Sequence, residues 1–131
     1  MNKTAEYIKR HREVVNELAK ELDGVVFTKA PFDIIDKKLR FFEVKVVRPL
    51  TGKHSAECRL NISENEVKFG EIVGDKLIYV IIFKGEKYII PFNELMSRIK
   101  SVKPFKGTLP GTISNVFRPC LSKKFLAKYK V

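Results

Sequence analysis

Residues 39–47, LRFFEVKVV, constrain the fold most strongly, because a charged pair interrupts an otherwise apolar stretch. β-Branched and aromatic residues in such a run favour a strand, and side chains two apart on a strand share a face. Glu43 and Lys45 are therefore expected side by side on one face, with Phe42 and Val44 on the other. Charges in this setting are costly unless they are paired or used. An ion pair on a half-exposed strand and a functional site both remain open.

The chain around this strand is predicted to alternate between helices and strands. Apolar residues at a spacing of three to four, on a face that also holds Tyr7 and His11, predict the first helix. Asp23 and Gly24 end it, since glycine can take a left-handed conformation. The expected elements are a helix at 4–22, strands at 25–28, 31–35 and 39–47 with a turn at 36–38, a long loop at 48–61, a helix from Ser63 to Gly74, strands at 77–83 and 87–92, and a helix at 94–100 capped by Asn93.

The last part of the chain differs in charge from the rest. Residues 101–131 contain seven Lys or Arg and no Asp or Glu, so they supply +7 of the formal net charge of +11. We therefore expect a core at 1–100 and a basic extension at 101–131. Residues 103–112 are expected to be a loop and 121–130 to end in a short helix. Apolar residues such as Leu121, Phe125 and Leu126 predict that the extension packs on the core or on a partner subunit.

This charge distribution favours a polyanionic partner, because lysine and arginine release counterions when they neutralise phosphates. Membrane surfaces and acidic proteins remain alternatives. The longest apolar run, at 77–83, is strand-sized and too short to span a membrane. Cys58 and Cys120 lie far apart in sequence and form no zinc pattern with the two histidines, which favours reduced thiols. A cytoplasmic location is expected on these grounds.

The tripeptide EVK occurs a second time, at residues 66–68, and the two copies differ in context. Ser63 and Glu66 fit the capping box that opens a helix. Residues two apart on a helix point in different directions, so the charges of Glu66 and Lys68 are expected to diverge. The second copy is therefore interpreted as structural, with Glu66 acting as the capping partner.

Asp33 gives the first copy a chemical interpretation. It lies in APFDII, on the preceding extended segment, ten residues before Glu43. A turn at 36–38 would bring Asp33 and Glu43 close together, and paired carboxylates are suited to Mg²⁺ or Mn²⁺. Lys45 would stand beside the metal, where a cation can orient water or stabilise a phosphorane. This combination is suited to phosphodiester hydrolysis.

The pattern D-x(9)-E-x-K on a strand hairpin after an N-terminal helix resembles the PD-(D/E)XK nuclease superfamily. The resemblance covers about residues 5–100 and is closest to archaeal Holliday junction resolvases and Mrr-like endonucleases, with the proline-aspartate loosened to Pro31-Phe32-Asp33. It implies a restriction-endonuclease-like core, in which helices flank a mixed sheet of four to five strands in αβββαβ order. It implies that Asp33, Glu43 and the backbone of Val44 bind the metal. Glu13 is implied as the acid of the first helix, with Glu17 as the alternative.

The resemblance also implies a function. The expected protein is a metal-dependent, structure-specific DNA endonuclease that acts on branched DNA as a homodimer. A restriction or homing endonuclease, a non-catalytic nucleic-acid-binding module and an RNA-splicing endonuclease relative are the alternatives. The loop is long for a compact resolvase, and the basic extension has no counterpart in the resemblance, so the substrate stays open. The residues expected to contact nucleic acid are Lys29, Arg48, Lys53, Arg59, Lys123 and Lys124.

Overall fold

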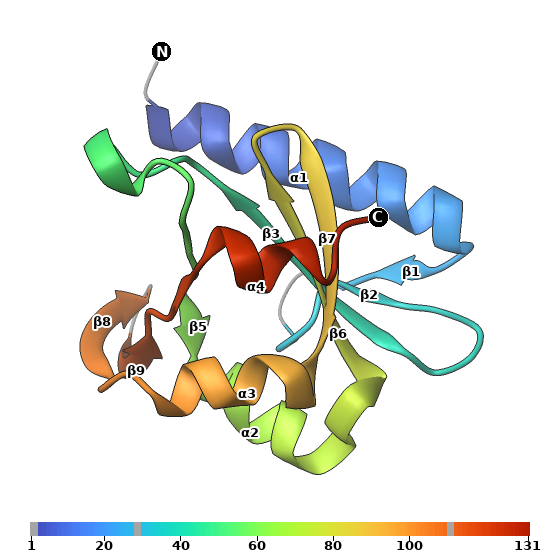
Figure 1. The fold of residues 1–131 in the computed structure, drawn as a ribbon. Coiled ribbons are helices and arrows are strands. Elements are labelled where there is room, and N and C mark those ends of the chain that lie inside the picture. Colours follow the sequence, from blue (N-terminus) through green and yellow to red (C-terminus); the bar gives the residue numbers. More distant parts are fainter. Residues whose placement is uncertain (1–2, 28–29, 110–111) are drawn as a thin grey trace.

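The computed structural model describes residues 3–27, 30–109 and 112–131 and shows an α/β fold around a five-stranded mixed sheet (Figure 1). The expected mixed sheet flanked by helices is thus confirmed. Neighbouring strands are antiparallel except for the central pair, β3 and β6, which is parallel. In spatial order the strands are β1 (Val25–Val26), β2 (Ile34–Ile35), β3 (Phe41–Val47), β6 (Leu77–Phe83) and β7 (Glu86–Pro91).

Helix α1 (Lys3–Leu22) covers one face of this sheet (Figure 1). Its apolar side, formed by Val15, Leu18 and Ala19, is buried against the inward-facing residues of β3. Those β3 residues alternate with partly buried ones along the strand, as the sequence pattern predicted. The apolar cluster between α1 and the sheet consists of Val15, Leu18, Ala19, Ile34, Phe42, Val44, Val46 and Val80.

The opposite face of the sheet is covered by α2 (Glu64–Val73), α3 (Phe92–Lys100) and α4 (Lys123–Ala127). Tyr79 and Ile81 of β6 are fully buried there. Helix α2 approaches α3 closely at Gly70, where a Cβ atom would come within 2.2 Å of the Phe92 ring. Any side chain larger than hydrogen would therefore push the two helices apart. This face carries Glu43 and Lys45, since they alternate with the residues under α1.

The loop after β3 is partly ordered into short elements. It contains the 3₁₀ helix η1 (Gly52–His54), β4 (Cys58–Arg59) and β5 (Ile62–Ser63). The extension contributes β8 (Phe105–Leu109), β9 (Thr112–Phe117) and β10 (Cys120–Leu121). β5, β9 and β8 form a three-stranded sheet, and β10 pairs with β4. The expectation of a loop at 103–112 was therefore wrong for residues 105–109 and 112, which belong to β8 and β9. β8 pairs with β9, and β9 pairs with β5, a distant partner that local composition does not reveal.

The basic extension packs on the core of the same chain. Leu121, Phe125 and Leu126 are buried in the cluster beneath α2 and α3. The chain end then runs beside β7, where the Ile89 N–H donates to the Tyr129 carbonyl at 3.0 Å and the Val131 N–H donates to the Lys87 carbonyl at 2.9 Å. Pairing of this kind covers a sheet edge that would otherwise expose unpaired backbone groups.

Two helix ends differ from the prediction. The left-handed residue after α1 is Asp23, with φ 52°, and Gly24 is needed because a Cβ there would lie 2.8 Å from the Ile35 carbonyl oxygen. Helix α3 begins at Phe92 after an N-cap Pro91, so Asn93 is not its cap. Asp75, from the 3₁₀ helix η2 (Gly74–Lys76), accepts the Asn93 N–H instead, at 2.9 Å.

Within the described ranges, the structure has no helix that is both long and apolar enough to cross a membrane. Cys58 and Cys120 are free cysteines, as expected. Although β4 and β10 are paired, Cys58 lies opposite Leu121 and Cys120 lies opposite Arg59. Because adjacent residues of a strand point to opposite faces, the two thiols face opposite sides of this ribbon.

Candidate active site

The hairpin of β2 and β3 opens at Asp33, and this opening defines the candidate site. β2 pairs with Phe41 and Phe42, and the Asp33 N–H donates to the Phe42 carbonyl at 2.7 Å. Beyond Asp33, β2 no longer pairs with β3, and the Asp33 side chain instead forms a hydrogen bond with the β3 backbone. Its Oδ2 accepts the Val44 N–H at 2.7 Å. The carboxylate is thereby fixed beside the middle of β3.

His11 of α1 reaches the backbone of the same residue, at the same edge of β3. Its Nε2–H donates to the Val44 carbonyl at 2.9 Å, and Nε2 lies 3.8 Å from Asp33 Oδ2. Glu13 and Glu17 are exposed on α1, so the structure does not bring either predicted helix acid to the hairpin. His11 is the residue of α1 that contacts the site, because the face that packs on the sheet contains position 11 and not position 13.

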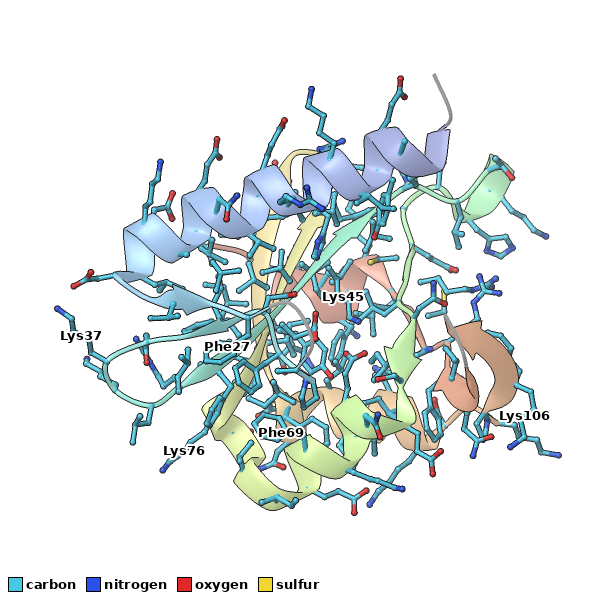
Figure 2. The ribbon with its side chains drawn as sticks, turned by 180° about the vertical axis from the view of Figure 1, so that it is seen from behind. Phe27, Lys37, Lys45, Phe69, Lys76 and Lys106 are labelled. Carbon is cyan, nitrogen blue, oxygen red and sulfur yellow. The ribbon has the colours of Figure 1, made fainter. Side chains whose placement is uncertain are left out.

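Lys45 extends from β3 toward α2 and is held there by two groups. Its Nζ lies 2.9 Å from Glu66 Oε1 and donates to the Asn61 carbonyl at 2.8 Å. The side chains of Lys45 and Glu66 are only 16% and 9% exposed. Figure 2 shows Lys45 near the centre of the molecule, whereas Lys37, Lys76 and Lys106 lie at its periphery. The ammonium group is therefore oriented inside a protein pocket.

Glu66 serves two purposes at once. Its Oε2 accepts the Ser63 N–H at 3.0 Å, and its backbone N–H donates to Ser63 Oγ at 3.2 Å, which confirms the capping box. Its Oε1 binds Lys45 and accepts the Tyr79 hydroxyl at 3.2 Å. The predicted capping role of Glu66 is confirmed, and the charges of Glu66 and Lys68 do diverge, since Lys68 is exposed and pairs with Glu64. The ion pair with Lys45 was not predicted; it forms because α2 lies over the face of the sheet that carries Lys45.

The carboxylates around Lys45 shift several pKa values. Burial raises the pKa of Glu43 well above its ordinary value; Lys45 opposes this rise, and Glu66 and Asp33 add to it. Burial lowers the pKa of Lys45, but the neighbouring Glu66 and Glu43 outweigh burial and raise it overall. Burial and the same two carboxylates raise the pKa of the Tyr79 hydroxyl. Lys45 therefore keeps its positive charge, whereas the surroundings of Glu43 favour the protonated carboxyl more than water does, an effect that a nearby cation would oppose.

Aromatic packing holds the segment that carries Asp33 against α2. The Phe32 ring lies 4.9 Å from the Phe41 ring and 5.3 Å from the Phe69 ring, measured between centroids. Phe27 joins the cluster at 5.2 Å from Phe32. Figure 2 shows Phe27 and Phe69 on the same side of the molecule, between the first hairpin and α2. Phe32 thus anchors the loop from one side while Asp33 is directed toward β3.

The donor atoms of this site fit a small hard cation. Asp33 and Glu43 are close enough for a carboxyl–carboxylate hydrogen bond, which contributes to the raised pKa of Glu43. A divalent cation would relieve that pairing of acids. No cluster of three or more His, Cys, Asp or Glu suited to a metal occurs among the described residues. Asp33 and Glu43 are therefore the two carboxylates that could hold a cation. The Val44 carbonyl, the third ligand that the resemblance implies, accepts the His11 N–H, and Mg²⁺ commonly completes a small ligand set with water.

The residues predicted to contact nucleic acid are placed differently from one another. Arg48 and Arg59 line a cavity next to Lys45. Lys53 is exposed on η1, and Lys123 and Lys124 are exposed on α4. Lys29 lies outside the described residues.

No model of a protein family matches the chain, and a search among curated proteins found no match either. The family resemblance thus remains a hypothesis, and the site geometry is the basis for any function assigned to the chain. That geometry adds His11, Glu66 and Tyr79 to the predicted residues. The sequence could have indicated His11, because a histidine lies on the apolar face of the first helix. Nothing in the sequence indicated Tyr79, which lies inside an apolar strand.

Proposed function

We propose that the protein is a Mg²⁺- or Mn²⁺-dependent DNA endonuclease with a restriction-endonuclease-like core. The observation that supports this proposal is the meeting of Asp33, Glu43 and Lys45 at the opening of the β2–β3 hairpin. Two adjacent carboxylates beside an oriented lysine are the groups that phosphodiester hydrolysis needs. The basic character of the chain provides attraction for a polyanion.

Each residue of the site has a role in this proposal. Asp33, Glu43 and the Val44 carbonyl would hold the cation, which supplies charge stabilisation and a nucleophilic water when bound. Lys45 places a fixed positive charge where negative charge develops on the phosphate. Glu66 holds the Lys45 ammonium in position, and Asp33 is itself held by the Val44 N–H. A site fixed before the substrate binds loses little free energy to reorganisation.

Branched DNA cut by a homodimer is the form of the proposal that the resemblance to resolvases favours. Two copies related by a two-fold axis suit a junction that has two-fold symmetry. A restriction or homing endonuclease has the same metal site and would differ in its requirement for a base sequence. The substrate therefore distinguishes these forms, and the metal site does not.

A non-catalytic nucleic-acid-binding module is the second candidate, and one observation favours it. Lys45 is already bound to both Glu66 and the Asn61 carbonyl, an arrangement that a purely structural ion pair would also show. In that case the only role of Asp33 would be its hydrogen bond with the β3 backbone at Val44, and no cation would be needed.

One incubation separates the candidates. Purified protein is offered four-way junction, linear duplex and single-stranded DNA of the same sequence, with Mg²⁺ or with EDTA. Junction cleavage that requires Mg²⁺ supports a resolvase-like enzyme, and cleavage of duplex at one sequence supports a restriction or homing enzyme. Binding without cleavage of any substrate, with Mg²⁺ and with Mn²⁺, supports the non-catalytic module and contradicts the nuclease proposal.

A further inference from the structure

A cavity of about 460 Å³ opens directly beside the Lys45 side chain. It lies between the N-terminal part of α1, the end of β3, the β4–β5 segment and the residue that follows β9. The lining residues used below are Tyr7, Lys45, Arg48, Arg59, Asn61 and Arg118. Its volume lies within the range of pockets that hold small molecules or single nucleotides, about 300–1,000 Å³. The candidate active site and the basic extension therefore share one cavity.

The charged residues that line the cavity are basic. Four of its lining residues are Lys or Arg, and its described lining includes no Asp or Glu. Arg118 brings a charge from the extension, and its guanidinium lies 5.6 Å from the centre of the Phe105 ring. A guanidinium supported by an aromatic ring loses less side-chain freedom when it binds a phosphate. Arg118 is thus placed as an anion ligand on the wall opposite α1.

An aromatic ring stands at the other wall. Tyr7 is 38% exposed, and the Arg48 guanidinium lies 5.7 Å from its ring centre. Tyr7 and Arg48 also line a second cavity of about 530 Å³, where Arg10 and Lys84 outnumber the one acid, Glu6. Nucleic-acid bases stack on aromatic rings and on guanidinium planes. The two cavities therefore form a basic path with a stacking platform where they meet.

We propose that this path binds an unpaired segment of a DNA strand beside the scissile phosphate, with Arg59 and Arg118 as phosphate ligands and Tyr7 as the stacking platform. The inference rests on the proposed nuclease function for its orientation, since Lys45 marks the reacting end of the path. The substrate class is then DNA with unpaired nucleotides next to the cut.

The shape of the path favours an unpaired strand over a duplex. Lys45 is only 16% exposed, so a phosphate must enter the cavity to approach it. Bases inside a duplex are stacked on one another and cannot offer a face to Tyr7 unless they leave the stack, which costs the free energy of unstacking and unpairing. A strand that is already unpaired avoids that cost.

The test is DNA binding in EDTA, where no cutting occurs, measured by fluorescence anisotropy over a range of salt. The probes are a labelled deoxythymidine oligonucleotide and a labelled duplex. Tyr7→Ala and Arg118→Ala are each expected to weaken binding of the single strand about tenfold, with a smaller effect on the duplex. Arg118→Ala should also reduce the salt slope by about 0.7 for the lost phosphate contact. Tyr7→Phe and Arg118→Lys should retain most of the affinity.

Two exposed lysines serve as matched controls. Lys106→Ala removes a charge from β8 in the same extension, and Lys76→Ala removes one from η2 (Figure 2). If Arg118→Ala and Lys106→Ala lose affinity equally, the extension acts as a diffuse positive charge and the inference is overturned. Equal losses on single strand and duplex overturn it as well.

Failure of the inference can be distinguished from failure of the nuclease proposal. If the protein cuts DNA in Mg²⁺ while the Tyr7 and Arg118 variants bind and cut normally, the proposed single-strand path is contradicted and the nuclease proposal is supported. If those variants lose single-strand binding while the wild type cuts no DNA, the path is supported as a binding site and the nuclease proposal is contradicted.

Discussion

Lys45 of β3 and Glu66 of α2 form an ion pair of 2.9 Å, although each belongs to a separate copy of the tripeptide EVK. The pair joins the strand of the candidate site to the helix that covers it. The same Glu66 carboxylate caps α2 through Ser63 and accepts the Tyr79 hydroxyl. One side chain thus couples the start of a helix to the orientation of the proposed catalytic lysine.

Glu66→Gln is expected to lower the cleavage rate by about tenfold or more. Glutamine at this position still fits a capping box, so the helix start is kept while the charge that holds Lys45 is lost. The free energy of unfolding should fall by about 1–3 kcal/mol, because a hydrogen bond between charged groups is weakened. Rate and urea denaturation, measured on the same preparations, check both effects.

Glu64→Gln is the matched control for this prediction. Glu64 lies on the same first turn of α2 but pairs with Lys68 on the surface, at 3.5 Å. Exposed pairs contribute about 0–1 kcal/mol, so this variant should cut DNA at the normal rate. Equal rates for the Glu64 and Glu66 variants would show that the Lys45–Glu66 pair has no part in cleavage.

The raised pKa of Glu43 predicts how stability changes with pH and metal. Because the folded state favours the protonated carboxyl, this contribution to stability is fully present below the ordinary glutamate pKa. It is lost as pH rises through the raised value. A divalent cation favours the ionised form, so Mg²⁺ or Mn²⁺ should raise the melting temperature most at neutral and alkaline pH.

Glu43→Gln removes both effects. The variant should be more stable than the wild type at neutral pH without metal, since it buries no carboxylate, and Mg²⁺ should stabilise it much less. Melting temperatures measured with Mg²⁺ and with EDTA at several pH values provide the check. A wild-type protein that is not stabilised by either cation would contradict the assignment of the metal ligands.

His11→Ala should reduce cleavage more than Glu13→Ala does. His11 donates to the Val44 carbonyl at 2.9 Å, whereas Glu13 is exposed. Loss of the imidazole leaves a carbonyl at the open edge of β3 without its donor, which costs about 1–3 kcal/mol. Glu13→Ala should change stability by no more than about 0.5 kcal/mol. Kinetics and thermal unfolding of both variants decide between them, and a larger rate loss for Glu13→Ala would restore the helix acid that the sequence predicted.

Asp36 stabilises the turn that joins Asp33 to Glu43. Its carboxylate accepts the backbone N–H groups of Lys38 and Arg40 and pairs with the Arg40 guanidinium at 2.7 Å. Burial raises the pKa of Asp36, but the bonds and charge of Arg40 outweigh burial and lower the pKa overall. The contribution of Asp36 to the free energy of unfolding is therefore present above the ordinary aspartate pKa. It is lost as the pH falls through the lowered pKa of the folded state.

Asp36→Ala should accordingly lower the free energy of unfolding by about 1–3 kcal/mol at neutral pH. The loss should shrink in strong acid, where the wild-type carboxylate is protonated as well. Lys38→Ala, on the same turn, is the control and should be nearly neutral. Denaturation curves at neutral and acid pH give the result, and a loss that does not depend on pH would argue against a role for the charge.

Local sequence patterns predicted most of the main sheet with its flanking helices, and the proximity of Asp33 and Glu43. Alternation in 39–47 gave the correct two faces of β3, and the spacing of Asp33 and Glu43 around a turn placed them together. These features depend on residues close in the chain, where strand period and turn chemistry act directly. The capping box at Ser63 was predicted for the same reason.

Features that depend on packing between distant segments were not predicted. β8 and β9 form because β5 supplies a partner more than forty residues earlier. Glu66 belongs to the site because α2 lies across the sheet at one particular angle, and His11 belongs to it because of the rotation of α1 about its axis. Neither angle can be read from residue spacing, so Glu13 was predicted where His11 is found.

Cleavage of DNA by the wild type and by Asp33→Asn, with Mg²⁺ and a four-way junction, tests the central claim most directly. The wild type is expected to cut and Asp33→Asn to lose cleavage, while DNA binding is unchanged or stronger because a negative charge near the phosphate is removed. Lys76→Ala, on the surface of η2, should cut normally. Cleavage by Asp33→Asn at a rate near that of the wild type would contradict the account, because the carboxylate at the open hairpin would then have no part in the reaction.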